Sequence, residues 1–176
     1  MKNISIINKP LVSVVVPNYN YAAYLEQRLD SILDQTYKNL EVILLDDCSQ
    51  DNSVAILSEY KNKDRRIKKL IVNTINSGSP FRQWALGLSY AQGKYVWIAE
   101  CDDYADIMFV EHLVAILENH EEVSLAFSGS LVVDRNDNLL NKDFDKWTCQ
   151  QINGTKGYKV LNGLQYASRN LFWSNR

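Results

Sequence analysis

Three carboxylates follow an apolar run near the middle of the chain, in the stretch VWIAECDDYAD at residues 96–106. They belong to Glu100, Asp102 and Asp103. Like charges this close repel one another, and each makes its neighbours harder to ionise. Folding alone gives a weak reason for such a cluster, so we expect a positively charged partner there. An acidic turn that caps the following helix is the alternative.

Two further polar clusters, PNYN at residues 17–20 and DDCSQD at 46–51, also follow apolar runs directly. Continuous apolar runs are typical of strands that are buried on both faces of a parallel sheet. The sequence predicts strands at 11–16, 40–46, 67–72, 94–99 and 123–129. Ligands of such sheets bind at the carboxyl ends of the strands. We therefore expect the three polar clusters to form one site.

Helical periodicity separates these strands. The first helix is predicted to be capped by Asn20, with an inner face at Leu25, Leu29 and Ile32 or Leu33. A short helix is predicted at 51–60. Ser79 and Pro80 are a strong start signal for a third helix, with a predicted inner face at Trp84, Leu88 and Ala91. A fourth helix is predicted at 106–119, with an inner face at Phe109, Leu113 and Ile116 or Leu117.

Strands that alternate with helices indicate an α/β protein in which helices cover both faces of a mostly parallel sheet. This pattern weakens beyond Gly129. Residues 134–138 are predicted to form a turn, and residues 158–176 begin like a helix. We therefore expect one main domain over residues 1–130 and a different region over 131–176.

Composition places the chain among soluble globular proteins. Its 176 residues are 46% hydrophobic and 23% charged, which is enough for one domain with its own core. The net charge of −2 gives no reason to expect a nucleic acid partner. Three cysteines without metal-like spacing favour reduced thiols. The start is too polar for a signal peptide, and no apolar run approaches the roughly 18 residues of a membrane span. We expect a cytoplasmic protein, with peripheral membrane attachment left open.

The segment VSVVVPNYNYAAYLEQRLDSILDQTYKNLEVILLDDCSQDNS, followed by AQGKYVWIAECDDY, resembles family 2 glycosyltransferases of the GT-A fold. The Gln-Thr-Tyr turn, the Asp-Asp pair and the acidic cluster occur in the family's order. The resemblance implies a three-layer α/β/α, Rossmann-like fold with a donor-binding domain at 1–130 and the start of the acceptor-side region at 131–176. It also implies transfer of a sugar from a nucleoside diphosphate sugar, usually with inversion and with Mg2+ or Mn2+.

The resemblance also assigns roles to the polar clusters. A hard cation can bridge carboxylates and a sugar diphosphate, which would otherwise repel each other. Asp102 and Asp103 match the family's most characteristic acidic positions, and Glu100 stands where many members have an Asp. Asp47 matches the residue that accepts a hydrogen bond from the base, and the N–H of uracil suits a carboxylate acceptor, so a UDP-sugar is favoured. The residues expected to bind the nucleotide are Pro17, Tyr19, Asp46, Asp47, Arg82 and Asp102.

Several of these roles have alternatives. A solvated turn explains Asp46 as well as a ligand does, and rim packing could explain Tyr19. Arg82 would lie in the first turn of a helix, where a cation opposes the helix dipole unless an anion binds there. A surface arginine is equally compatible. Family members often carry an Arg-Asn pair slightly later, where this chain has Trp84 and Ala85. The residues interpreted as surface histidines or space-filling thiols are His112, His120, Cys48 and Cys101.

No residue matches the family's general base, a carboxylate at a helix start well beyond the acidic cluster. No Glu follows Glu122, and the later acids lie in turn-like stretches at Asp134, Asp137, Asp143 and Asp145. The sequence is therefore interpreted as the amino-terminal portion of a longer enzyme with a saccharide or lipid-linked acceptor. Truncation would uncover apolar residues near the end, so a homodimer is considered through Leu171, Phe172 and Trp173.

Two other classes of protein share acids at strand ends. A sugar nucleotidyltransferase would usually carry a glycine-rich, basic phosphate loop after the first strand, and PNYNYAAY lacks both glycine and lysine. A phospho-receiver signalling domain, which is not an enzyme, needs a phosphoacceptor Asp and a Lys at later strand ends. Labelling with a phosphodonor would identify it. The glycosyltransferase interpretation is favoured.

Overall fold

The structure is a computed structural model that describes residues 9–134, 136–141, 160 and 162. The chain divides into two compact units, Met1–Ala115 and Ile116–Arg176, each of which is described by itself. Among the described residues, no helix is both long and apolar enough to span a membrane.

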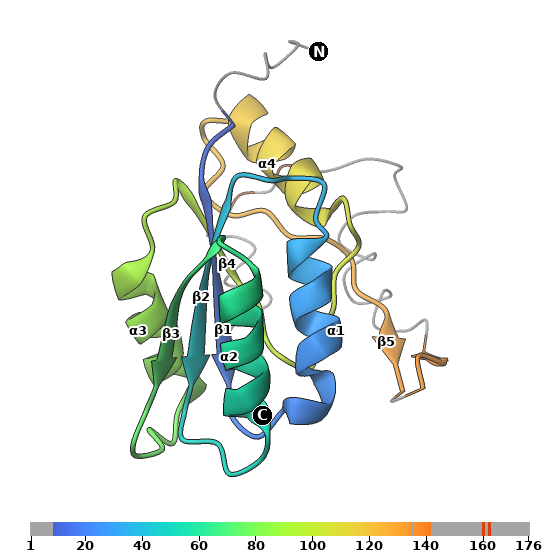
Figure 1. The fold of residues 1–176 in the computed structure, drawn as a ribbon. Helices are drawn as coiled ribbons and strands as arrows, with labels where there is room; N and C mark the ends of the chain where they lie inside the picture. The colour runs from blue at the N-terminus through green and yellow to red at the C-terminus, as the bar shows by residue number, and fades with distance from the viewer. Residues whose placement is uncertain (1–8, 135, 142–159, 161, 163–176) are drawn as a thin grey trace. The chain divides into compact units, whose positions relative to one another are not determined.

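The first unit is built on a four-stranded sheet with the strand order β3-β2-β1-β4 (Figure 1). Its strands are β1 (Val12–Asn18), β2 (Leu40–Asp46), β3 (Ile67–Val72) and β4 (Tyr95–Ile98). All neighbouring pairs are parallel. Every residue of the two central strands β1 and β2 is buried, which explains their continuous apolar sequences.

Helices cover both faces of this sheet, as predicted (Figure 1). The helices α1 (Ala22–Leu33) and α2 (Ser53–Lys63) pack on one face with the start of α4 (Phe109–Asn119), and α3 (Pro80–Tyr90) packs on the other. Alternate side chains of β1 pack on opposite faces of the sheet. Val14 and Val16 join the larger apolar cluster, whereas Val15 joins the cluster under α3. The α/β prediction is confirmed.

The start of α1 differs from the prediction, because Asn20 does not cap it. Asn20 has a positive φ of 60°, and its Oδ1 accepts a hydrogen bond from the Gln50 N–H at 2.7 Å. The helix instead begins after Tyr21, and the Ala22 N–H donates to Asp51 Oδ2 at 2.9 Å. A carboxylate that is distant in sequence therefore satisfies a donor at this helix start, and a local capping pattern cannot reveal it.

The inner faces of α3 and α4 also differ from the predictions. In α3 the buried residues are Gln83 and Gly87, whereas Trp84 is half-buried and Leu88 is exposed. Gly87 lets the helix approach the sheet closely, since an added Cβ would lie 2.2 Å from Val15 Cγ1. In α4 the buried residues are Val110 and Val114, while Phe109, Leu113, Ile116 and Leu117 are half-buried. In both helices the buried stripe is displaced by one residue from the predicted one.

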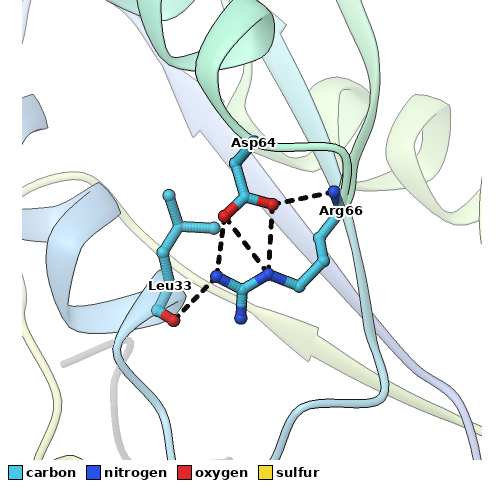
Figure 2. Close-up of polar contacts among 3 residues, drawn as sticks. All are labelled: Leu33, Asp64 and Arg66. Atoms are coloured by element: carbon cyan, nitrogen blue, oxygen red, sulfur yellow. Dashed lines mark hydrogen bonds and ion pairs between the residues drawn. The ribbon is translucent and has the colours of Figure 1, made fainter.

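A hydrogen-bonded clamp just before the start of β3 ties α2 and β3 to α1 (Figure 2). Arg66 Nη2 donates to Asp64 Oδ2 at 2.7 Å and to the carbonyl oxygen of Leu33, the last residue of α1, at 2.8 Å. Asp64 also accepts from the Arg66 N–H at 2.8 Å. A forked guanidinium suits this arrangement because its donors point in fixed directions.

In the second unit, the predicted strand at 123–129 is wrong, because these residues form no strand. β-favouring residues make a strand only where a partner supplies a hydrogen-bonded ladder. The described strands here are a short antiparallel pair, β5 (Val132–Val133) and β6 (Leu139–Asn141). Asp134 accepts the N–H groups of Asn136 and Asn138, so the predicted turn at 134–138 is confirmed. The helix expected from 158 and the apolar residues 171–173 lie outside the described residues, apart from Val160 and Asn162.

Candidate functional site

A cavity of about 660 Å³ lies where the carboxyl ends of β1, β2 and β4 meet the start of α3. This is the edge of the sheet at which the polar clusters were expected to meet. The residues that line it are Pro17, Asn18, Tyr19, Tyr21, Asp47, Asn76, Gly78, Ser79, Pro80, Gln83, Trp84, Glu100, Cys101 and Asp102. Parallel topology alone brings these segments together, since they are far apart in sequence.

Five of the residues predicted to bind ligands line this cavity, and three do not. The five are Pro17, Tyr19, Asp47, Glu100 and Asp102. Asp46, Arg82 and Asp103 are not among its lining residues.

Asp46 is fully buried and is hydrogen-bonded to other residues of the protein. Its carboxylate accepts from Asn18 Nδ2 at 2.7 Å, from the Ser49 N–H at 2.9 Å and from Ser49 Oγ at 2.7 Å. These bonds join the end of β1 to the turn after β2. The position therefore fits a structural role better than contact with a nucleotide.

Asp47 lies at the cavity and organises the connection between β3 and α3. Its Oδ1 accepts from Asn73 Nδ2 at 2.7 Å and from Gln83 Nε2 at 2.7 Å, and its Oδ2 accepts from Ser77 Oγ at 2.7 Å. The Ser77 N–H reaches both oxygens. Burial works to raise the pKa of Asp47, but the hydrogen bonds from Ser77 and Asn73 and the charge of Arg82 hold the pKa below its ordinary value. Asp47 is thus a fixed, ionised acceptor.

Arg82 is exposed, and its Nη1 donates to the Ser77 carbonyl at 3.1 Å. The structure therefore places its guanidinium at the loop that surrounds Asp47, where its charge favours the ionised carboxylate.

The acidic segment after β4 contains carboxylates in unlike surroundings. Glu100 is half-buried and accepts from Trp84 Nε1 at 2.6 Å, whereas Asp102 and Asp103 are exposed. Burial raises the pKa of Glu100; the Trp84 hydrogen bond opposes this, and the charges of Asp102 and Asp103 add to it. Of the two aspartates, Asp102 faces the cavity.

The carboxylates do not form a ready-made metal centre. In the part of the chain that the structure describes, no three Asp, Glu, His or Cys side chains converge as metal ligands. Mg2+, however, is usually held by one or two carboxylates together with substrate phosphates and waters. Glu100 and Asp102, the carboxylates of this segment that line the cavity, fit a site of this shared kind.

Sequence reasoning missed a positive partner of the acidic segment, Arg28 of α1. Arg28 is only 3% exposed, and its guanidinium carbon lies 4.8 Å from the ring centroid of Trp97. Burial lowers the pKa of Arg28, and the charge of Asp103 is the strongest influence opposing that shift. Position 28 lies one helical turn from Leu25 and Ile32, so an arginine on the predicted inner face was the available signal.

Gln35 is a second residue that the sequence reasoning missed. Its buried amide donates to the carbonyls of Ser31 at 2.9 Å and Asp106 at 2.7 Å, and accepts from the Val110 N–H at 2.9 Å. It thereby ties the end of α1 to the start of α4 and fixes the far end of the acidic segment.

The histidines and Cys101 differ in their position relative to the cavity. Neither His112 nor His120 lines the cavity. Cys101 lines it, but its thiol is buried and donates to the Pro17 carbonyl at 3.1 Å. Burial raises the pKa of this thiol to about 12, so it is a poor nucleophile.

Known proteins resemble this chain in sequence. The family model described as glycosyl transferase family 2 matches residues 13–167. The chain belongs to glycosyl transferase family 2. The resemblance recognised in the motifs is therefore confirmed over most of the chain.

Curated relatives of this family 2 chain are considerably longer. An uncharacterized glycosyltransferase of Haemophilus influenzae is 39% identical over 115 residues, which cover 65% of this chain and 45% of the relative. The poly(ribitol-phosphate) beta-N-acetylglucosaminyltransferase TarS of Staphylococcus aureus is 32% identical over 111 residues, which cover 61% of this chain and 19% of TarS. The chain thus spans less than half the length of these relatives.

Solved structures share its fold. TarS 1–349 from S. aureus in complex with UDP-GlcNAc superposes with a TM-score of 0.58 at 28% identity, covering 63% of this chain and 32% of that one. The mannosyltransferase PcManGT from Pyrobaculum calidifontis in complex with GDP-Man and Mn2+ has a TM-score of 0.58 at 26% identity, covering 74% and 38%. These likenesses confirm the α/β GT-A fold of the family 2 chain.

Proposed function

We propose that this chain carries the donor-binding part of an enzyme that transfers a sugar from a nucleoside diphosphate sugar, with UDP-sugars favoured, to a saccharide or lipid-linked acceptor. The observation that carries the proposal is the cavity at the strand ends, where Tyr19, Asp47 and Asp102 meet from three distant segments. The likeness to structures that hold UDP-GlcNAc and GDP-Man supports a nucleotide sugar in this place.

Three of the residues that line the cavity have proposed roles at the nucleotide. Asp47 faces the base as a fixed acceptor, and Tyr19 and Pro17 flank the base or the ribose. A base N–H would have to share a carboxylate that already accepts from Asn73, Ser77 and Gln83. Asp46 and Arg82 act indirectly, Asp46 by holding the strand ends and Arg82 by keeping Asp47 ionised.

We further propose that the acidic segment, with Glu100 and Asp102 at the cavity and Asp103 next to them in the sequence, shares a Mg2+ or Mn2+ ion with the diphosphate. When bound, such an ion offsets the negative charge of the leaving diphosphate. The likeness to PcManGT, whose structure contains Mn2+, supports this. Transfer with inversion and a division into a donor region at 1–130 and an acceptor-side region from 131 remain proposals. No general base is assigned, and the Asp134 carboxylate is occupied within its own turn.

A thermal-unfolding panel tests this function. UDP, GDP, CDP and ADP are each added with and without Mn2+, and UDP at a hundred times its dissociation constant should stabilise the chain by about 2.7 kcal/mol. Asp102→Asn should remove the Mn2+-dependent part of this stabilisation. Asp34→Asn, the same change at an exposed position after α1, is the matched control. The proposal is contradicted if no nucleotide stabilises the chain, or if Asp102→Asn and Asp34→Asn behave alike.

A further inference from the structure

The carboxylate of Asp47 lines the cavity, yet donors from the protein itself already occupy it. The four donors are Asn73 Nδ2, the backbone N–H and the Oγ of Ser77, and Gln83 Nε2. An ionised carboxylate offers about four lone-pair sites in all. A donor on a ligand must therefore take the place of one of these four groups before it can bond to Asp47.

Gln83 is the donor that stands on the cavity side of this carboxylate. Among the described residues that donate to Asp47, only Gln83 also lines the cavity, whereas Asn73 and Ser77 do not. Asn73 and Ser77 belong to the connection between β3 and α3, and Gln83 belongs to the start of α3. A group that enters from the cavity consequently meets the Asp47 carboxylate where Gln83 now bonds to it.

The amide of Gln83 is only half satisfied in this position. A carboxylate can only accept, so the amide atom that lies 2.7 Å from Asp47 Oδ1 is the nitrogen, which also lies 3.2 Å from Ser77 Oγ. This orientation leaves Gln83 Oε1 buried and without a donor in the part of the chain that the structure describes. A buried acceptor without a partner costs free energy, so the bond to Asp47 is made at the expense of the amide oxygen.

We propose that Gln83 is a placeholder for the base, so that its Nε2 leaves Asp47 Oδ1 and the N–H of uracil takes its place when UDP binds. The inference rests on the proposed function. The Asp47 carboxylate keeps the same number of donors in this exchange, and rotation of the Gln83 side chain frees its Oε1 to find a partner. Rotations of side chains are common on binding and require no movement of α3.

The exchange makes Gln83 a specificity-determining residue. A base with an N–H at this place replaces the bond that Gln83 gives up. A base without such a donor either leaves Gln83 where it is or leaves a lone pair of Asp47 unfilled. Sites that require a hydrogen-bonding group on the ligand discriminate strongly against analogues that lack it.

Calorimetric titration of the parent chain and of Gln83→Met tests the exchange. Methionine has nearly the same length as glutamine but no amide donor. The free variant lacks a bond to Asp47 that, in this proposal, the complex never contains. UDP should therefore bind about threefold to tenfold more tightly to the variant than to the parent. The N3-methyl derivative of UDP, which has no base N–H, should gain no affinity from the same substitution.

Gln83→Asn gives a second measurement, so the outcome does not depend on how well the methionine variant folds. Its amide is one methylene shorter and cannot make the same bond to Asp47, so UDP should again bind more tightly. Gln92→Met makes the same change as Gln83→Met at an exposed position beyond α3, and it should leave the affinity for both nucleotides unchanged.

The direction of the change decides the outcome. The inference stands if either Gln83 variant binds UDP more tightly than the parent without a matching gain for N3-methyl-UDP. If UDP binds more weakly or equally well to both variants, Gln83 supports the cavity wall or contacts the ligand itself, and the inference is overturned. An equal gain for both nucleotides also overturns it. If the parent chain does not bind UDP at all, the proposed function fails, and the inference fails with it.

Discussion

Asp46 and Asp47 are adjacent carboxylates with different surroundings. Successive side chains of an extended segment point in opposite directions, so neighbouring residues at a strand end meet different partners. Asp46 takes its donors from Asn18 and Ser49 and is completely buried. Asp47 takes its donors from the β3–α3 connection and lines the cavity. The first carboxylate therefore holds two strand ends together, while the second shapes the wall of the site.

The role of Asp47 as an organiser leads to a prediction for Asp47→Asn. The amide would turn an N–H₂ group toward donors on Asn73, Ser77 or Gln83, and at least one buried donor would lose its acceptor. We expect the free energy of unfolding to fall by about 1–3 kcal/mol, and UDP affinity to fall with it. Urea unfolding and calorimetric titration with UDP measure the two effects. Asp34→Asn serves as control, and equal stability of the two variants would contradict the proposed organising role.

The sequence was enough to predict several residues of the cavity, but it did not predict which side chains are hydrogen-bonded to each other. Polar clusters after apolar runs were enough to place Tyr19, Asp47 and Asp102 at one edge of the sheet, because parallel topology fixes where strand ends meet. The bond between Trp84 and Glu100 depends on how far α3 lies from β4, which no local pattern contains. Arg28 was missed because an arginine within an apolar stripe was not weighed as a buried cation.

At the scale of the elements, the way α3 packs on the sheet sets the position of one wall of the cavity. One face of this helix is pressed against Val15 and Leu45 through Gly87, and its first turns carry Gln83 and Trp84 into the cavity wall. A glycine in mid-helix normally costs about 1 kcal/mol relative to alanine. Here the missing side chain permits an approach that any Cβ would prevent, so the position of the cavity wall depends on it.

Gly87→Ala should therefore destabilise the protein although alanine favours helices. The new Cβ would lie 2.2 Å from Val15 Cγ1, and Val15 is a fully buried, β-branched residue that cannot move aside. Overpacking of this kind costs about 1–3 kcal/mol, against a gain in helix propensity of about 1 kcal/mol. The displaced helix should also bind UDP more weakly. Ala85→Gly, at an exposed position of the same helix, should weaken stability without changing UDP affinity.

The elements themselves were predicted unevenly, for a physical reason. The central strands β1 and β2 were recognised because burial on both faces demands an apolar run. The predicted ranges 40–46 and 67–72 coincide with β2 and with the edge strand β3, which is only partly buried. The segment 123–129 also contains apolar residues, but it pairs with no strand among the residues that the structure describes. Helix faces shifted by one residue where a glycine or a valine, rather than a large side chain, makes the contact.

At the scale of the whole molecule, carboxylates join elements that are distant in sequence. Asp51 accepts from Ala22 at the start of α1, and Asp64 with Arg66 holds α2 and β3 to α1. Glu111 of α4 accepts from Thr36 and Lys9. The pKa of each of these carboxyls is lowered. Burial works to raise the pKa of Asp51, but its hydrogen bonds outweigh this effect. The hydrogen bond from Arg66 is the largest cause for Asp64, and the hydrogen bond from Thr36 is the largest cause for Glu111.

These carboxylates make the free energy of unfolding dependent on pH. A group whose pKa is lower in the folded protein binds fewer protons there than in the unfolded chain, so its contribution is present above the unfolded pKa and is lost as the pH falls through the folded pKa. With unfolded values near 4, we expect the free energy of unfolding to change little between about pH 7 and 5 and to fall steeply below about pH 4. Glu100 opposes this trend, because burial raises its pKa and acid relieves the cost of its charge.

Urea unfolding at a series of pH values between about 7 and 3.5 tests this, and Asp64→Asn sharpens it. The variant loses the ion pair with Arg66, so it should be less stable than the parent at neutral pH. It has no proton to take up at this position, so its stability should fall less steeply in acid than that of the parent. The two curves should therefore converge as the pH is lowered. Parallel curves would mean that Asp64 contributes nothing to the acid dependence, and that the clamp of Asp64, Arg66 and Leu33 does not depend on charge.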